Sequence, residues 1–294
     1  MKDTLIQWCD STVSPTTGCS GCELFNHERK SCYAGVMHER RLAKTLPNLY
    51  AKDFLEVRLA PGRMAKAAAW PDLTGQDRPD KPWLNGMPRV IFVSDMSDAL
   101  SQGVPFQYLR DEIVEVVESP AGRRHIWMWL TKQPYRMECF ARTLDRWPAN
   151  LWAGTSVTTQ GTTTRIQNVL KVPAARHFVS AEPMWESIDL HARELLCRDY
   201  PDGITVGKYL DLVILGGESG PLAKPFDVEW ARSLVQQCRE TKTAAFVKQL
   251  GDKPYRVEPC KDFDFKPVDL KLKDHHGGDW SEWPEDLRVR EFPA

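Results

Sequence analysis

The chain lacks a strong charge of either sign, a long apolar run and an export signal, and each absence excludes a class of protein. Its 294 residues carry a net charge of −1, so no overall positive field attracts nucleic acid, and any such binding depends on a local patch. The sequence contains no run of about 18 apolar residues, which is the length that a membrane-spanning helix needs. The N-terminal residues Met1-Lys2-Asp3-Thr4 are unlike a signal peptide, so we expect a cytoplasmic protein that does not bind membranes.

The cysteines are better interpreted as ligands and core residues than as disulfides, which the reducing cytoplasm disfavours. Three of the eight, Cys19, Cys22 and Cys32, lie in a polar loop with the spacing C-x2-C-x9-C. Three thiolates leave one position of a metal centre open, whereas a structural zinc site usually has four protein ligands. Gly18 and Gly21 allow the tight backbone that such a loop needs.

Two kinds of metal centre fit this spacing. A zinc knuckle would take a fourth ligand from Cys9, His27 or His38. Cys9 is also a candidate fourth ligand if a first strand ends near the loop. A chain of this length does not need a small metal knuckle to stabilise its fold, which favours an iron–sulfur cluster.

Six short apolar runs indicate parallel strands buried on both faces, because the runs are continuous and not alternating. They cover residues 90–93, 126–130, 151–153, 177–179, 212–215 and 244–247. Helical patterns separate them at 106–118, 135–146, 162–171 and 228–241, and Asp227 is the expected N-cap of the last. A further strand near 5–8 brings the total to about seven. This alternation predicts an α/β fold, a partial or complete (β/α) barrel of the TIM type; an open doubly wound sheet is the alternative.

Polar residues follow all six runs, where a barrel places its active site. The candidate site residues after the strands are Ser94, Asp95, Thr131, Lys132, Ser156, Ser180, Glu182, Gly216, Gly217, Glu218 and Lys248. Asp98 either joins this pocket or caps the next segment. The two glycines either admit a ligand to the backbone or form a tight turn. A carboxylate such as Glu182 is costly there unless paired, and Lys132 and Lys248 are candidate partners.

Two regions fall outside the alternation. Residues 71–88 are rich in Pro, Gly and Asp and indicate a loop. Residues 252–294 lack helical periodicity, and we expect an extension packed on the barrel through Trp280 and Trp283, with a disordered tail as the alternative. We therefore predict a barrel over 1–251, with an N-terminal cysteine loop, and a C-terminal extension over 252–294.

Basic residues gather locally in a chain that has no overall positive charge. The clusters are His38-Glu39-Arg40-Arg41 and Arg123-Arg124-His125. Such clusters are usually solvated faces, but phosphate contacts need only local positive charge of this kind.

Several segments resemble a phage-derived three-cysteine-motif protein family that is described as radical-SAM-like. The matching segments are T-G-C at 17–19, C-Y-A at 32–34, V-S-D-M-S-D at 93–98, L-T-K-Q-P at 130–134, G-T-S-V at 154–157, F-V-S-A-E-P at 178–183, V-I-L-G-G-E-S-G-P at 213–221, V-K-Q-L-G at 247–251 and G-G-D-W-S-E-W-P-E-D-L-R-V-R-E at 277–291. Together they extend over nearly the whole chain. The cysteine spacing differs from the C-x3-C-x2-C of most radical-SAM enzymes, and Tyr33 follows the third cysteine where those enzymes have an aromatic residue before it.

The resemblance implies an enzyme in which Cys19, Cys22 and Cys32 hold a [4Fe–4S] cluster. It implies S-adenosylmethionine as the second cofactor, bound with the substrate by Tyr33 and the strand-end residues. Cleavage of S-adenosylmethionine would yield a radical that abstracts a hydrogen atom from the substrate. The phage association suggests a DNA or nucleotide substrate, as in DNA hypermodification, in the cytoplasm of a host cell. A flavodoxin-like or ferredoxin-like electron donor is the implied partner.

Two other classes of function remain open at this point. One is a zinc-binding protein without redox chemistry that recognises nucleic acid or a protein partner. The other is a hydrolase or lyase that uses Glu182 and Glu218 as acid and base, with a structural metal. Barrels host many chemistries, so the fold alone does not choose among them.

Overall fold

The computed structural model describes residues 4–190, 197–199, 205–208, 210–259 and 265–293, and the chain divides into two compact units. The N-terminal unit comprises Met1–Thr155 and Asn168–Arg176. The C-terminal unit comprises Ser156–Gln167 and His177–Ala294 and so contains all of the segment predicted as an extension. Cys260 lies outside the described residues.

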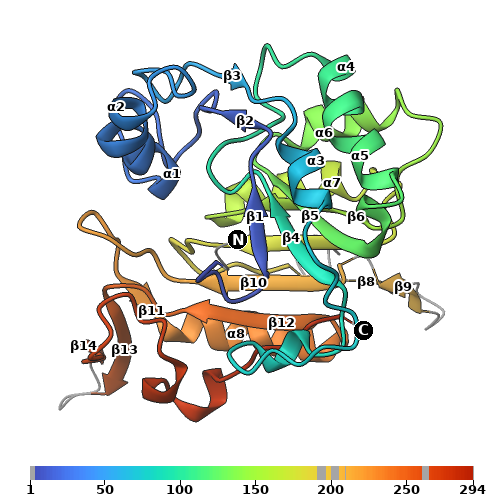
Figure 1. Cartoon of the computed structure of the whole chain (residues 1–294). Coiled ribbons are helices and arrows are strands. Elements are labelled where there is room, and N and C mark those ends of the chain that lie inside the picture. The colour runs from blue at the N-terminus through green and yellow to red at the C-terminus, as the bar shows by residue number, and fades with distance from the viewer. Residues whose placement is uncertain (1–3, 191–196, 200–204, 209, 260–264, 294) are drawn as a thin grey trace. The chain divides into compact units, whose positions relative to one another are not determined.

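The fold is mixed α/β, as predicted, and its main feature is a set of parallel strands (Figure 1). Seven strands follow one another in the order β1-β4-β5-β6-β7-β10-β12. This order is compatible with a partial barrel. In the described part of the chain β1 and β12 do not pair with each other, so a complete barrel is not shown.

The parallel strands of the N-terminal unit are short and almost completely buried. They are β1 (Ser11–Val13), β4 (Arg89–Val93), β5 (His125–Thr131) and β6 (Leu151–Ser156). In register, Ile91 of β4 lies between Ser11 of β1 and Trp127 of β5. The apolar runs therefore predicted β4, β5 and β6 correctly.

The first strand was predicted at 5–8, and this is wrong, because β1 begins at Ser11. The physical reason is the ammonium group of Lys81, which binds backbone carbonyls of this segment. It donates hydrogen bonds to the backbone carbonyls of Thr4, Ile6 and Cys9 at 2.6 to 2.8 Å, so the segment bends around one cation. Trp8 packs on Phe92 of β4, with the ring centroids 4.6 Å apart.

Short helices accompany these strands. They are α1 (Tyr33–Met37), α2 (Ala43–Thr45), α3 (Arg63–Ala68), α4 (Phe106–Leu109), α5 (Glu115–Glu118) and α6 (Pro134–Ala141). Wider π-helical turns at His38–Leu42 and Arg110–Val114 join α1 to α2 and α4 to α5. The helix predicted over 106–118 thus forms with one wider turn inside it. β2 (Thr16–Thr17), which directly precedes the cysteine loop in sequence, pairs with β3 (Arg58–Leu59) in a two-stranded sheet.

The C-terminal unit contains the other three parallel strands, β7 (His177–Ala181), β10 (Leu212–Gly216) and β12 (Ala244–Gln249). The helix α8 (Val228–Glu240) connects β10 to β12, and α7 (Thr164–Val169) precedes β7. The predicted N-cap of α8 is confirmed, because the Asp227 carboxylate accepts the Glu229 N–H at 3.0 Å. Two further strands, β8 (Cys197–Asp199) and β9 (Thr205–Lys208), form a hairpin.

The segment after β12 contains two strands that the sequence pattern did not predict. β13 (Pro254–Pro259) pairs with β11 (Phe226–Asp227) and with β14 (Phe265–Asp269). The chain then returns to β12, where the Val247 N–H donates to the Val289 carbonyl at 2.8 Å. Trp283 is buried and donates its indole N–H to the Gly277 carbonyl, whereas Trp280 is 36% exposed.

No helix among the described residues is both long and apolar enough to cross a bilayer.

Candidate functional site

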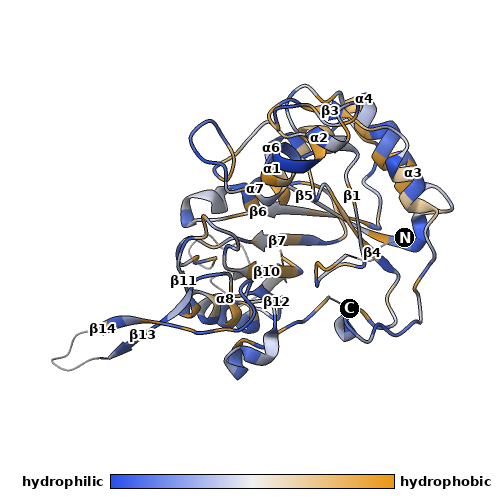
Figure 2. Ribbon diagram, turned by 60° about the vertical axis from the view of Figure 1, so that its left-hand side comes forward, coloured by the Kyte–Doolittle hydropathy of each residue, from blue (hydrophilic) through white to orange (hydrophobic). Residues whose placement is uncertain are grey.

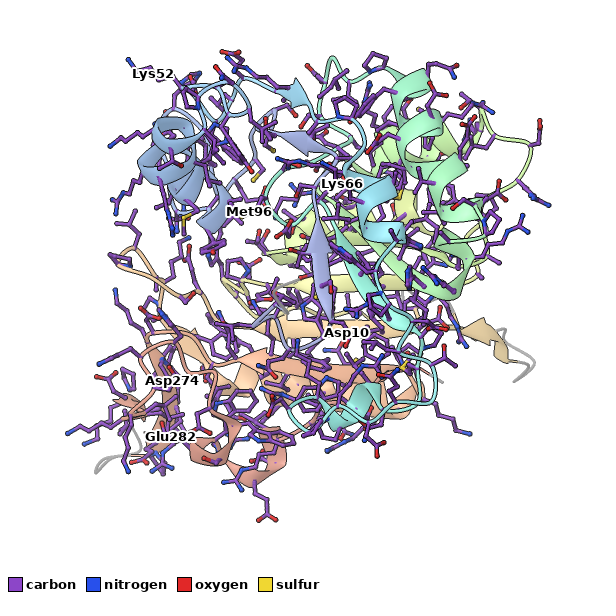
Figure 3. All side chains as sticks on the ribbon, in the orientation of Figure 1. Asp10, Lys52, Lys66, Met96, Asp274 and Glu282 are labelled. Atoms are coloured by element: carbon purple, nitrogen blue, oxygen red, sulfur yellow. The ribbon has the colours of Figure 1, made fainter. Side chains whose placement is uncertain are left out.

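The cysteine loop lies in the N-terminal unit between β2 and α1, and backbone hydrogen bonds hold each cysteine. The N–H groups of Cys19, Cys22 and Cys32 donate to the carbonyls of Phe54, Phe25 and Leu24 at 2.8, 2.9 and 3.0 Å. The rings of Phe25 and Phe54 meet edge to face, with centroids 4.9 Å apart. Cys19 and Cys32 pack against this aromatic pair, and so does Met96, which Figure 3 labels.

Two glycines, one in the loop and one in α1, occupy positions where a side chain would clash. Gly18 has a φ of +77°, and a Cβ atom there would lie 2.2 Å from the Glu56 carbonyl oxygen. Gly35, in α1, has the Phe25 ring 2.3 Å from the position of a Cβ atom. The glycines therefore let the loop and α1 pack closely on the segment that contains Phe54.

The three thiols are free and half-buried, and they influence one another electrostatically. Burial raises the pKa of Cys19 to about 12, and the charges of Asp98, Cys22 and Cys32 add to this, against a hydrogen bond from the Gly21 N–H. Burial also raises the pKa of Cys22, which Lys132 and a hydrogen bond from the Leu24 N–H oppose. Like charges gathered in one loop are stabilised by a bound cation, which is what a metal centre supplies.

The segment from Ser94 to Ser101, which follows β4, supports the cysteine loop. Thr16 donates its hydroxyl to Ser97 at 2.9 Å, and the Ser20 N–H donates to the Ser101 hydroxyl at 3.0 Å. The predicted site residue Asp95 accepts the hydroxyl of Ser14 at 2.7 Å. These contacts give the segment a structural role behind the cysteines.

Ser94, the first residue after β4, has a φ of +76°. This left-handed conformation is unfavourable for a residue with a side chain, and such strain is found most often at functional sites. Its hydroxyl accepts the Ala99 N–H at 3.3 Å, which fixes the turn into the supporting segment.

Asp98 caps its own segment, which is one of the two alternatives predicted for it, and it also contacts the end of β5. Its buried carboxylate accepts the Leu100 N–H at 3.0 Å, the Lys132 N–H at 2.9 Å and the Thr131 hydroxyl at 2.8 Å. Burial raises the pKa of Asp98, and these donors oppose the rise. The carboxylate thus joins the end of β4 to the end of β5 beside Cys19.

Lys132 and Tyr33 are the other predicted residues near the cysteines. The Lys132 side chain is half-buried, and its charge acts on Cys22. Among the described residues it has no hydrogen-bond acceptor or carboxylate within ion-pair distance. Tyr33 begins α1 directly after Cys32, and it is 70% exposed.

Three candidate zinc or cluster ligands differ in their placement. Cys9 precedes β1 and is fully buried, whereas the cysteine loop follows the other end of that strand, so the expected strand ending at Cys9 is wrong. His38 is buried, and its Nε2 lies 2.8 Å from the Ala51 carbonyl; its Nδ1 has no hydrogen-bond partner in the described part of the chain. His27 is exposed in the loop.

The chemistry of the three cysteine side chains fits a metal centre with thiolate ligands. Three free thiols share one loop, and N–H groups bond to two of the sulfurs, as in iron–sulfur sites. Within the described ranges, no three Cys, His, Asp or Glu side chains are already arranged to hold a metal ion.

The remaining predicted residues form a second group, in the C-terminal unit. Glu182, after β7, pairs at 2.5 Å with Lys248 of β12, one of its two predicted partners, and both are half-buried. Ser180 and Ser156 are buried, and the Ser156 carbonyl accepts the Arg165 guanidinium at 3.1 Å.

Gly216 is the last residue of β10 and Gly217 follows it, and the backbone beside them takes the space of a side chain. A Cβ atom on Gly216 would lie 2.6 Å from the Gln249 carbonyl oxygen, and one on Gly217 would lie 2.3 Å from that of Leu250. The close approach is therefore made by the last residue of β12 and the residue after it.

Glu218 is buried and holds two neighbouring segments together. One oxygen accepts the indole N–H of Trp185 at 3.0 Å and the Lys224 N–H at 3.1 Å. The Lys224 ammonium lies 3.9 Å from the centre of the Trp185 ring. Trp185 and Lys224 were not among the predicted residues, and a tryptophan two residues after a strand-end Glu-Pro was the available signal.

Comparison with known proteins gives a family without an assigned activity. A family model described as "Protein of unknown function (DUF5131)" matches residues 3–278. No curated protein and no solved structure matches the chain. Since the model extends over most of the sequence, the chain belongs to the DUF5131 family.

Proposed function

We propose that this protein is a radical S-adenosylmethionine enzyme whose [4Fe–4S] cluster is held by Cys19, Cys22 and Cys32. The observation that carries the proposal is the gathering of three free, half-buried thiols in one loop, each fixed by a backbone hydrogen bond. The resemblance to a radical-SAM-like family supports it. When bound, such a cluster supplies one electron for the reductive cleavage of S-adenosylmethionine.

The residues around the loop would bind and orient the cofactor and the substrate. Asp98 fixes the backbone of Lys132, whose unpaired ammonium is suited to a carboxylate of the bound molecule. Thr131, Ser94 and Asp95 position the strand ends, and Tyr33 offers an exposed ring. In the C-terminal unit the Glu182–Lys248 pair and Glu218 are proposed as binding groups for substrate or cofactor. A flavodoxin-like or ferredoxin-like electron donor and a cytoplasmic location belong to the same proposal.

A zinc site is the second candidate, and one observation favours it. Among the described residues, the buried Nδ1 of His38 has no hydrogen-bond partner. The centroid of its ring lies 5.2 Å from that of Phe54, a member of the cluster against which Cys19 and Cys32 pack. Three thiolates and one imidazole are a common zinc ligand set. The protein would then be a recognition protein without redox chemistry.

Metal analysis after anaerobic purification and reconstitution distinguishes the two. A cluster enzyme contains about four irons and four sulfides per chain, and each of the variants Cys19→Ala, Cys22→Ala and Cys32→Ala loses them. Cys139→Ala, a half-buried cysteine outside the loop, is the matched control and keeps them. The reduced wild type then releases 5′-deoxyadenosine from S-adenosylmethionine.

Three results would contradict the enzyme. They are an intact cluster in Cys32→Ala, no 5′-deoxyadenosine from a fully loaded and reduced protein, and one tightly bound zinc per chain that His38→Ala releases. The last of these supports the zinc site.

A further inference from the structure

The segment from Arg29 to Arg58, which runs from the cysteine loop to β3, has a local excess of positive charge. It contains seven Lys and Arg residues against three Asp and Glu residues, a net charge of +4. The whole chain has a net charge of −1, so the rest of the chain is acidic. The excess is therefore a local patch and not a property of the composition.

Four cations of this segment are exposed and unpaired. They are Arg40, Arg41, Lys44 and Lys52, the last labelled in Figure 3. In the part of the chain that the structure describes, their charged groups make no ion pair or hydrogen bond. Two of the three acids in the segment are already engaged, since Glu39 pairs with Lys30 at 2.9 Å and Glu56 pairs with Arg58 at 3.0 Å.

The unpaired cations do not stabilise the helical stretch that presents them. Arg40 and Arg41 lie in the π-helical turn between α1 and α2, and Lys44 lies in α2, where Figure 2 colours much of the ribbon as hydrophilic. Lys44 is three and four residues from the two arginines, so the three charges share one side of the helix and repel one another. A phosphate chain would relieve this repulsion.

Tyr33 adds a second kind of contact at the end of this stretch. Its ring is 70% exposed and directly follows Cys32. Exposed aromatic rings beside cations stack on unpaired bases, and arginine guanidinium groups bind phosphate with two parallel hydrogen bonds. In a duplex the bases are stacked on each other, so a ring of this kind favours a single strand.

We propose that Tyr33, Arg40, Arg41, Lys44 and Lys52 form a surface that binds single-stranded nucleic acid next to the cysteine loop. The inference rests on the proposed function in one respect, because it names the substrate class that the cysteine site would receive. Binding itself requires only phosphates for the cations and an unpaired base for the ring. It can therefore be measured on the full chain whether or not a cluster is loaded.

The first test measures affinity by fluorescence anisotropy with labelled 20-nucleotide DNA and RNA strands of one sequence and with the DNA duplex. The variant Arg40→Gln/Arg41→Gln/Lys44→Gln is compared with Lys66→Gln/Lys253→Gln/Lys271→Gln, which removes three exposed cations that lie outside both basic clusters. We expect the first variant to bind the single strands at least tenfold more weakly, with a salt dependence reduced by about 2 log units per log unit of salt. The control variant keeps the wild-type affinity within about twofold, and the relative affinity for DNA and RNA identifies the preferred strand.

The second test addresses the ring. Tyr33→Ala should weaken binding about fivefold or more, and Tyr33→Phe, which keeps the ring, should bind as the wild type does. The thermal midpoint of every variant is measured in parallel, so that a loss of binding in a folded variant is attributed to the surface.

Four results would overturn the inference. They are no binding of either single strand by the wild type, equal losses in the two triple variants, duplex bound as tightly as single strand, and binding to vesicles with anionic lipids in preference to nucleic acid. Metal content is measured on the same samples. A protein that contains the cluster but does not bind nucleic acid contradicts this inference and leaves the proposed function standing. A protein that binds nucleic acid but contains no cluster supports this inference and contradicts the proposed function.

Discussion

The hydroxyl of Thr131 lies 2.8 Å from the carboxylate of Asp98 and joins the end of β5 to the end of β4. The same carboxylate accepts two backbone N–H groups, and its charge acts on Cys19. One buried residue therefore fixes two strand ends and sets the electrostatic surroundings of the cysteine loop.

The variant Asp98→Asn should lower both the stability of the protein and the pKa of Cys19. An amide offers one acceptor oxygen in place of two, so either the Leu100 or the Lys132 N–H loses its partner, at a cost of about 1–3 kcal/mol in the free energy of unfolding. Burial is the main cause of the raised pKa of Cys19, and the charge of Asp98 is the second largest cause. Removal of that charge should therefore lower the pKa of Cys19. Urea denaturation and the pH dependence of Cys19 alkylation, followed by peptide mass spectrometry, measure the two effects.

Asp95→Asn is the matched control for this variant. It makes the same change three residues away, in a carboxylate that accepts the Ser14 hydroxyl. If the two variants shift the alkylation profile of Cys19 equally, the assigned role of Asp98 is wrong.

Alkaline pH should destabilise the metal-free protein through Cys19. The pKa of this thiol is raised from 9.0 to about 12 in the folded state, so the folded protein holds the proton more tightly than the unfolded chain does. The resulting stabilisation is complete below pH 9 and is lost as the pH rises towards 12, with an upper limit of about 4 kcal/mol. Urea denaturation at pH 8 and pH 10.5 should therefore show a smaller decline for Cys19→Ala than for the wild type. Equal declines would show that Cys19 is not the group responsible.

The parallel strands could be predicted from the sequence because strands buried on both faces are continuous apolar runs. Val90 to Val93 and Leu212 to Leu215 are of this kind, and the polar residues after them mark the strand ends. The same reasoning made Lys248 one of two candidate partners of Glu182, because parallel strands end at one edge of a sheet, even though β10 lies between β7 and β12.

Other features depend on contacts between residues distant in sequence. Lys81 binds the carbonyls of Thr4, Ile6 and Cys9, and nothing near position 81 indicates that it displaces the first strand. The spacing of Cys19, Cys22 and Cys32 predicted a shared loop, but it does not reveal that Phe54 supports it. The residues of β13 and β14 are mostly exposed and do not form a continuous apolar run. The pattern that predicts buried strands therefore does not detect these two strands.

The ion pair between Glu182 and Lys248 should show a measurable coupling energy. Both groups are half-buried, so solvent screens their 2.5 Å contact less than that of an exposed pair, and we expect about 1 kcal/mol. A double-mutant cycle with Glu182→Gln and Lys248→Met, followed by urea denaturation, gives this value. The exposed pair Arg58 and Glu56 is the control and should couple by about 0.5 kcal/mol or less. If the coupling energy between Glu182 and Lys248 is no larger than that between Arg58 and Glu56, the two residues do not form a half-buried ion pair.

Gly217 should tolerate no side chain, because the position of its Cβ atom lies 2.3 Å from the Leu250 carbonyl oxygen. In Gly217→Ala the backbone after β10 or after β12 must move, and overpacking of this kind costs about 1–3 kcal/mol. The thermal midpoint should fall accordingly. Gly161→Ala is the matched control, since the nearest atom to its Cβ position is a threonine hydroxyl 3.8 Å away, and it should leave the midpoint unchanged. If Gly217 serves instead to admit a ligand to the backbone, Gly217→Ala would keep the stability of the wild type and lose only ligand affinity.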